Sequence, residues 1–114
     1  MHELGIVVHV MRMVEEVAAE NEITEIRSVT CEVGEVSGVV PAYLTDCWGY
    51  ARKKSELFQD AELIIEIIPG VTVCEDCGKT YSTVTYAKIC PHCGSGHTCL
   101  LEGNGFNIKE IEGA

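Results

Sequence analysis

The chain has 114 residues, of which 46% are hydrophobic and 23% charged, and this size suits one compact domain with a modest core. Its 18 acidic and 8 basic residues give a net charge of −10, so neither nucleic acid nor an anionic membrane surface is an expected partner. Seven cysteines are a high density for this length, and the odd number argues against complete internal disulfide pairing.

The beginning of the chain does not read as a secretory signal. Met1-His2-Glu3-Leu4 lacks a basic region, and Glu15 and Glu16 interrupt the apolar stretch that follows. No segment approaches the run of about 18 apolar residues that a membrane helix needs. We therefore expect a cytoplasmic protein that does not cross a membrane.

Residues up to Gly34 predict a helix followed by a strand. From Leu4 to about Asn21, apolar residues recur with the spacing of one helical face. From Glu25 the period changes to two, which fits a half-buried strand ending at Gly34. The apolar positions of the helix are Leu4, Val7, Val8, Met11, Val14, Val17 and Ala18, and those of the strand are Val29, Cys31 and Val33.

A second helix and a second strand follow. Pro41 suits the first turn of a helix, which we expect to end near Ser55 to Phe58. Residues 62–68 have apolar side chains at both odd and even positions, so both faces of the segment are apolar. This pattern predicts a more central strand. Pro69-Gly70 then marks the boundary between two lobes. The apolar face of the second helix comprises Leu44, Cys47, Trp48 and Ala51.

Residues 71–101 contain five of the seven cysteines and too few large apolar residues for an independent core. Cys74 and Cys77 form one pair with a two-residue spacer, and Cys90 and Cys93 form another. A glycine follows each pair and permits a tight turn, so four thiolates can converge on one tetrahedral ion. Zn²⁺ is the expected ion, and a closed shell of four sulfurs predicts a structural site.

The last segment predicts a strand at Phe106–Ile111, which we expect to return to the sheet of the first lobe. The predicted fold is therefore α+β, with two helices on a small three-stranded sheet and an inserted four-cysteine zinc-ribbon lobe. The first, α+β lobe would comprise residues 1–70 and 102–114. The zinc ribbon would comprise residues 71–101.

The remaining thiols and two histidines are open to several interpretations. Cys31 and Cys47 fall on apolar faces and are most simply small core residues. Cys99 has no partner of matching spacing. His92 and His97 lie in or next to the second cysteine pair, where each is either a metal ligand or an exposed loop residue.

These features together resemble the HypA/HybF hydrogenase nickel-incorporation proteins. The resemblance rests on the Met1-His2-Glu3 start, the order of helices and strands, and the two cysteine pairs, and it spans essentially the whole chain. It implies a metallochaperone, not an enzyme, that binds Ni²⁺ through its N-terminus. A partner GTPase would help deliver the metal to the large-subunit precursor of [NiFe]-hydrogenase, and some members also serve urease maturation proteins.

Carried onto this sequence, the resemblance makes His2 the essential nickel ligand, with Glu3 beside it. It also makes Cys74, Cys77, Cys90 and Cys93 the structural zinc ligands. One departure concerns an acidic residue that some members carry near the start of the second helix, because here that region reads Val39-Val40-Pro41.

A histidine at position 2 is by itself weak evidence and also fits an incidental terminal residue, but the chemistry of the N-terminus suits a nickel site. Ni²⁺ favours imidazole and amine nitrogen in a tetragonal plane. The Met1 amine, the His2 imidazole and the amide nitrogens of His2 and Glu3 can form fused chelate rings. The first N–H groups of a helix have no intrahelical acceptor, so these amides can lose a proton without breaking helical hydrogen bonds. We hypothesise this ligand set.

Two other functions compete with this one. The cysteine pairs are also typical of rubredoxin-like electron-transfer proteins, in which four cysteines hold one iron. A zinc-ribbon adaptor without a transported metal is the other alternative. A catalytic role is poorly supported, because the sequence has no phosphate loop and neither Cys31 nor Cys47 has an evident histidine partner.

Overall fold

A computed structural model describes residues 3–114 of the chain. It contains helices and strands in the mixed order that the sequence predicts, and the α+β fold class is confirmed. The helices are α1 (Glu3–Glu20), α2 (Pro41–Ala51) and α3 (Thr83–Tyr86), and the strands are β1 (Ile26–Gly34), β2 (Glu62–Ile68), β3 (Val71–Cys74), β4 (Thr80–Ser82), β5 (Thr98–Glu102) and β6 (Phe106–Gly113).

The described chain divides into two compact units. The first comprises the residues up to Glu32 together with Val39–Glu66 and Asn107–Ala114, and the second comprises Val33–Gly38 and Ile67–Phe106. The second unit therefore extends beyond residues 71–101 at both ends and includes the short segment that follows β1. None of the helices in residues 3–114 is long and apolar enough to cross a membrane.

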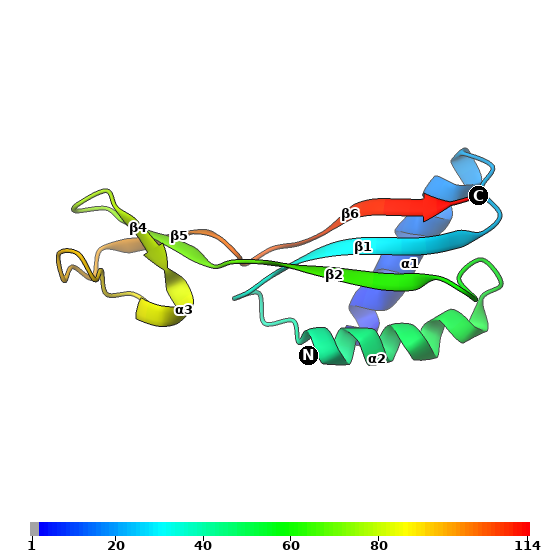
Figure 1. Cartoon of the computed structure of the whole chain (residues 1–114), viewed down its shortest axis with the longest axis horizontal. Coiled ribbons are helices and arrows are strands. Elements are labelled where there is room, and N and C mark those ends of the chain that lie inside the picture. The colour runs from blue at the N-terminus through cyan, green and yellow to red at the C-terminus, as the bar shows by residue number, and fades with distance from the viewer. Residues whose placement is uncertain (1–2) are drawn as a thin grey trace. The chain divides into compact units, whose positions relative to one another are not determined.

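The first sheet has the strand order β2-β1-β6, and Figure 1 shows β1 between the other two strands. The final strand thus joins this sheet, as the sequence predicts. Helices α1 and α2 pack against each other, and their apolar side chains form a core with β1. The most deeply buried side chains of this core are Val7, Val14, Ile26, Val29, Cys31, Leu44 and Phe58.

The prediction that residues 62–68 form the more central strand is wrong. Strand β2 lies at an edge and leaves Ile64 and Ile67 exposed, whereas β1 is central. On β1 even the polar Thr30 is buried, as expected of a central strand. The Lys109 ammonium of β6 pairs with the Glu66 carboxylate of β2 at 2.8 Å and links the two outer strands. Apolar residues on both faces of a strand therefore did not identify the central strand of this sheet.

Helix α1 follows the predicted range, but its buried face differs from the predicted one. Val10, which the helical pattern left out, is buried beside Val7, Met11, Val14 and Ala18. Leu4, Val8 and Val17 are exposed, although the pattern placed them on the core face. The buried stripe is narrower than the apolar stripe, so part of the apolar surface of α1 faces solvent.

Helix α2 ends at Ala51 and continues as a 3-10 turn over Arg52–Lys54, slightly earlier than expected. Trp48 anchors it: the indole N–H donates to the carbonyl of Ala61 at 3.0 Å, and the ring meets Phe58 edge to face at 5.7 Å. A buried tryptophan needs a partner for its N–H, and this contact supplies one. The helix is therefore fixed to the segment that leads into β2.

The second sheet has the order β4-β3-β5, and both neighbours run antiparallel to β3. Its buried side is small, comprising Cys74, Tyr81 and Cys90. The Tyr81 hydroxyl donates to the carbonyl of Ala87 at 3.0 Å, and its ring meets Tyr86 edge to face. This sheet was not predicted as such, because the strands are only three to five residues long and carry few large apolar residues.

Three backbone segments of the second unit approach one another at glycines. A Cβ on Gly34 would meet the carbonyl oxygen of Gly103 at 2.1 Å, and one on Gly103 would meet the Cα of Gly70 at 2.4 Å. The Val36 N–H donates to the Gly103 carbonyl, and the Glu35 N–H to the Ile68 carbonyl, each at 2.8 Å. These bonds require a separation that only glycine allows at the contact points.

A pair of glycine variants tests this contact. Gly34→Ala should lower the free energy of unfolding by about 1–3 kcal/mol, because the new methyl group displaces a neighbouring backbone. Gly49→Ala is the matched control: no atom lies within 4 Å of its Cβ position in α2, and helix propensity should raise stability by about 1 kcal/mol. Urea denaturation of the zinc-loaded protein measures both. A Gly34→Ala variant as stable as wild type would contradict the glycine contact.

Candidate metal centre

The two cysteine pairs form turns with the same backbone pattern. Gly78 donates its N–H to the carbonyl of Cys74, and Gly94 donates to Cys90, each at 2.8 Å. Both glycines adopt positive φ angles, +76° and +74°, which other residues rarely adopt. The glycine after each cysteine pair thus has the role that the sequence predicts.

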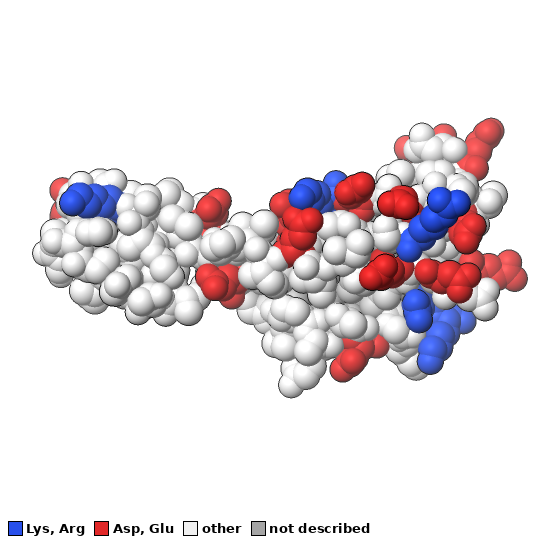
Figure 2. Space-filling model, viewed as in Figure 1, with Lys and Arg blue, Asp and Glu red and all other residues white. Residues whose placement is uncertain are grey.

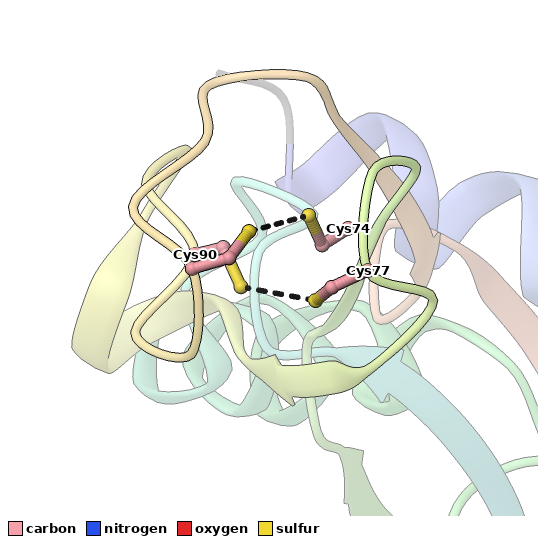
Figure 3. A group of neighbouring side chains, drawn as sticks. Cys74, Cys77 and Cys90 are labelled. Carbon is pink, nitrogen blue, oxygen red and sulfur yellow. Dashed lines mark hydrogen bonds between the residues drawn. The ribbon is translucent and has the colours of Figure 1, made fainter.

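The four sulfurs of Cys74, Cys77, Cys90 and Cys93 all lie within 4.8 Å of one another. Figure 3 shows the sulfurs of its three labelled cysteines turned toward a common centre, with Sγ–Sγ separations of 3.5 Å for Cys74–Cys93 and 3.6 Å for Cys77–Cys90. A tetrahedral zinc with Zn–S bonds of about 2.3 Å places its sulfurs about 3.8 Å apart. The separations are far longer than the S–S bond of about 2.05 Å in a disulfide. The cluster therefore fits a zinc ion held by four thiolates.

The four thiols of the cluster do not ionise alike. Burial opposes ionisation of Cys90, but N–H groups of Cys93 and His92 outweigh it and lower the pKa of the Cys90 thiol to about 7. At Cys93 the N–H of Ser95 favours the thiolate, but the Cys74 sulfur and burial raise the pKa to about 12. Four sulfurs this close cannot all ionise in isolation, and a divalent cation would offset their mutual repulsion.

A polar network joins the two turns outside the sulfur cluster. Ser95 donates its hydroxyl to the Asp76 carboxylate, and His97 Nδ1 lies 3.3 Å from the same carboxylate oxygen. The His97 carbonyl accepts the N–H of Glu75 at 2.8 Å. In residues 3–114, the group of side chains placed to hold a metal consists of the four cysteines and contains no histidine. The His97 side chain instead contacts Asp76 in the first cysteine turn.

The other three cysteines occupy different environments. Cys31 is fully buried in β1, and burial raises the pKa of its thiol to about 11. Cys47 is half-buried in α2, and Cys99 is exposed on β5. The expectation that Cys31 is a core residue agrees with this burial.

The predicted nickel ligands lie at the start of the chain, and Met1 and His2 fall outside the described residues. Glu3 begins α1, and its side chain is buried. A Glu3 carboxylate oxygen accepts the backbone N–H of Val40 at 3.1 Å, next to the first turn of α2. The positive end of that helix favours a carboxylate there. The first described residue is therefore tied to the residue that precedes α2.

The sequence pattern did not reveal two features of these sites, the Glu3–Val40 contact and the Asp76–Ser95–His97 network. Both join residues that are distant in sequence, so no local spacing signals them. Nothing in the sequence indicated that the charged Glu3 would be buried at the start of an amphipathic helix; only the fold shows it. A polar residue between two ligand cysteines was the only sequence signal for the network.

The fold and the cysteine cluster define a small α+β protein with a tetrathiolate zinc ribbon inserted before its last strand. A family model described as "Hydrogenase/urease nickel incorporation, metallochaperone, hypA" matches residues 1–113. The chain belongs to this HypA family, and the resemblance inferred from the sequence is confirmed.

Curated relatives agree over nearly the full length. The hydrogenase maturation factor HypA of Geobacter metallireducens is 34% identical and is aligned over 98% of both chains. The hydrogenase maturation factor HybF of Klebsiella pneumoniae is 31% identical over 99% of both. Among solved structures, that of the Ni metallochaperone HypA from Helicobacter pylori superimposes with a TM-score of 0.71 at 24% identity, covering 99% of this chain and 97% of the other.

These comparisons bear on the alternatives raised by the sequence. The matched relatives are maturation factors, and the rubredoxin-like and adaptor interpretations are not favoured. A rubredoxin-like assignment would also leave the first unit without a role. The four-cysteine site fits structural zinc within a nickel-handling family.

Removing one sulfur tests the zinc site. Cys74→Ser should abolish stoichiometric zinc binding and unfold the second unit, because the ion replaces most of its core. Elemental analysis measures the zinc, and amide NMR spectra report the fold of each unit. Cys99→Ser is the control and should keep both zinc and fold, because Cys99 lies outside the sulfur cluster. Zinc retained by Cys74→Ser would contradict the assignment.

Thiol reactivity gives a second test. With a pKa of about 11 rather than 9.0, Cys31 at pH 8 should be ionised roughly a hundredfold less than an ordinary thiol. Iodoacetamide should therefore label Cys99 first and Cys31 last in the zinc-loaded protein. Labelling of Cys31 should rise only toward pH 11 or on unfolding, as mass spectrometry of peptides would show. Equal rates for the two cysteines would contradict the burial of Cys31.

Proposed function

We propose that this chain is a nickel metallochaperone that binds Ni²⁺ at its N-terminus and delivers it for maturation of [NiFe]-hydrogenase. The observation that carries the proposal is membership of the nickel-incorporation family over residues 1–113, a range that includes the Met1-His2-Glu3 start. The zinc ribbon has a structural role in this scheme. Nickel and zinc would then use separate residues.

The proposed nickel ligands are the Met1 amine, the His2 imidazole and the backbone amides of His2 and Glu3. Nitrogen ligands in fused chelate rings suit Ni²⁺, whereas the zinc site offers only sulfur. The Glu3 carboxylate already accepts the Val40 N–H, which supports a ligand role for the Glu3 amide rather than its side chain. At the same time, the carboxylate would hold the first turn of α1 in place beneath the metal.

Delivery requires partners, because the proposed chemistry is ligand exchange and not catalysis. We propose a nickel-handling maturation GTPase as the source of energy and the [NiFe]-hydrogenase large-subunit precursor as the recipient, with urease maturation proteins as a further class. A cytoplasmic location follows from where these partners act. The nickel-binding lobe would correspond to residues 1–70 and 102–114.

Substitution of the key ligand separates the two metals. His2→Ala should abolish stoichiometric Ni²⁺ binding in calorimetric titrations and leave zinc content and fold unchanged, because the imidazole belongs to the nickel site alone. Wild-type affinity should fall steeply from about pH 7.5 to about pH 5.5, since protons compete for imidazole and amide nitrogen. Affinity that stayed flat over this range would exclude the nitrogen ligand set.

The protein in these titrations needs its native N-terminus. An otherwise identical chain with additional N-terminal residues is the matched control for the Met1 amine, and it should bind nickel more weakly. If the extended chain binds equally well, the amine is not a ligand. If His2→Ala retains nickel, the nickel site lies elsewhere in the chain. Separately, a red, iron-containing preparation of the wild-type protein would point to the rubredoxin-like alternative.

A further inference from the structure

An open groove of about 490 Å³ lies between α1 and the end of α2 in the first unit. Leu4 and Val8 contribute exposed apolar surface to it, at 48% and 42% of their full exposure, and Tyr50 of α2 lines the other side. Leu4 and Val8 are two of the three α1 residues that the helical pattern wrongly assigned to the core. Contiguous apolar surface of this kind often marks an interaction site.

The groove is elongated along α1. Its lining includes Leu4, Val8, Met11 and Glu15, which recur every three or four residues. With a rise of about 1.5 Å per residue, this stripe is about 16 Å long, or three helical turns. A partner helix with apolar residues at the same spacing matches such a groove, and a compact small molecule does not.

The charge around the groove differs from that of the rest of the chain. Arg12 and Lys54 line it, with Glu15 as the one acidic lining residue. The 3-10 turn Arg52–Lys54 carries three of the eight basic residues of the chain, whose net charge is −10. On the sheet side of the first unit, which Figure 2 shows, most charged side chains are acidic, with basic side chains among them near the end of α2. An acidic partner is therefore attracted locally to this groove.

Lys54 already has contacts that orient it at the groove. Its ammonium donates to the Tyr50 hydroxyl at 2.9 Å and lies 4.4 Å from the centre of the Tyr50 ring. This pairing lowers the pKa of Tyr50 and keeps the cation at the wall of the groove. An apolar partner residue can thus contact the ring while a partner carboxylate approaches the ammonium.

We infer that this groove binds an acidic amphipathic helix of a partner protein, with aliphatic side chains against Leu4 and Val8 and carboxylates beside Arg12 and Lys54. The groove begins one residue after Glu3, so a helix seated there lies next to the start of the chain. The inference rests on the proposed function only for the expectation that the partner takes part in nickel delivery. The binding chemistry itself is independent of nickel.

The probe is a pair of stapled helical peptides of about 15 residues with leucine at every third or fourth position. One peptide carries glutamate at the remaining positions and the other carries lysine. The glutamate peptide should bind the zinc-loaded full chain at least about tenfold more tightly at low salt, and the difference should shrink as salt screens the charges. Calorimetry gives the affinities, and amide NMR shifts should map the contact to Leu4, Val8 and Tyr50.

Two variants of α1 form a matched pair. Val8→Glu should reduce binding of the glutamate peptide by at least about tenfold, because it places a charge in the groove. Met13→Glu is the control: Met13 is also an exposed apolar residue of α1, at 45%, but it does not line the groove. Arg12→Glu should remove most of the preference for the glutamate peptide.

Three outcomes would overturn the inference. Equal binding of the two peptides would remove the charge argument, and equal effects of Val8→Glu and Met13→Glu would move the contact away from the groove. A dimer of the chain that Val8→Glu dissociates and Met13→Glu does not would make a second copy the occupant. Nickel titration of the same variants distinguishes failure of this inference from failure of the proposed nickel site. A groove variant that loses peptide binding but binds nickel normally affects the groove alone.

Discussion

Convergence of four sulfurs is the constraint on which the second unit depends. Its buried cluster comprises Cys74, Tyr81 and Cys90, so two of the three side chains are themselves metal ligands. The apolar surface that these three side chains bury is too small to offset the conformational entropy lost when about forty residues become ordered. A structural zinc site contributes about 10–16 kcal/mol at neutral pH in small domains. The β4-β3-β5 sheet is thus arranged around the ion more than around apolar side chains.

The two proposed metal sites differ in ways that keep their ions apart. The zinc site is a closed shell of sulfur, while the proposed nickel site uses terminal nitrogen ligands and no sulfur. The Glu3 carboxylate is already bonded to the Val40 N–H, so it fixes the first turn of α1 without needing to bind metal. A cargo site near a chain end can exchange its ligands, whereas the zinc cluster holds its ion within the fold. Selectivity then comes from ligand type and geometry rather than from raw affinity.

The sequence predicted most of this arrangement because its strongest signals are local. Helical periods placed α1 and α2, an alternating period placed β1, and a continuous apolar run placed β2. Two-residue cysteine spacing with a following glycine identified the metal cluster. Errors arose where tertiary contacts decide the outcome. Strand order depends on how β6 returns to the sheet, and apolar residues on β2 could not reveal it. Likewise, the helical pattern placed Val8 on the core face and left out Val10, whereas the fold buries Val10 and exposes Val8.

The matching backbone turns around the two cysteine pairs have a kinetic consequence. Each turn is closed by bonds within its own few residues, such as Gly78 to Cys74 and Gly94 to Cys90. Either half can therefore form before the ion arrives, and loading requires only that two preformed halves meet across a short connection. Closing a loop of about ten residues takes about 10–100 ns, so chain diffusion is not limiting. Loss of the thiol protons, which metal binding requires, would then set the pace at which the ribbon assembles.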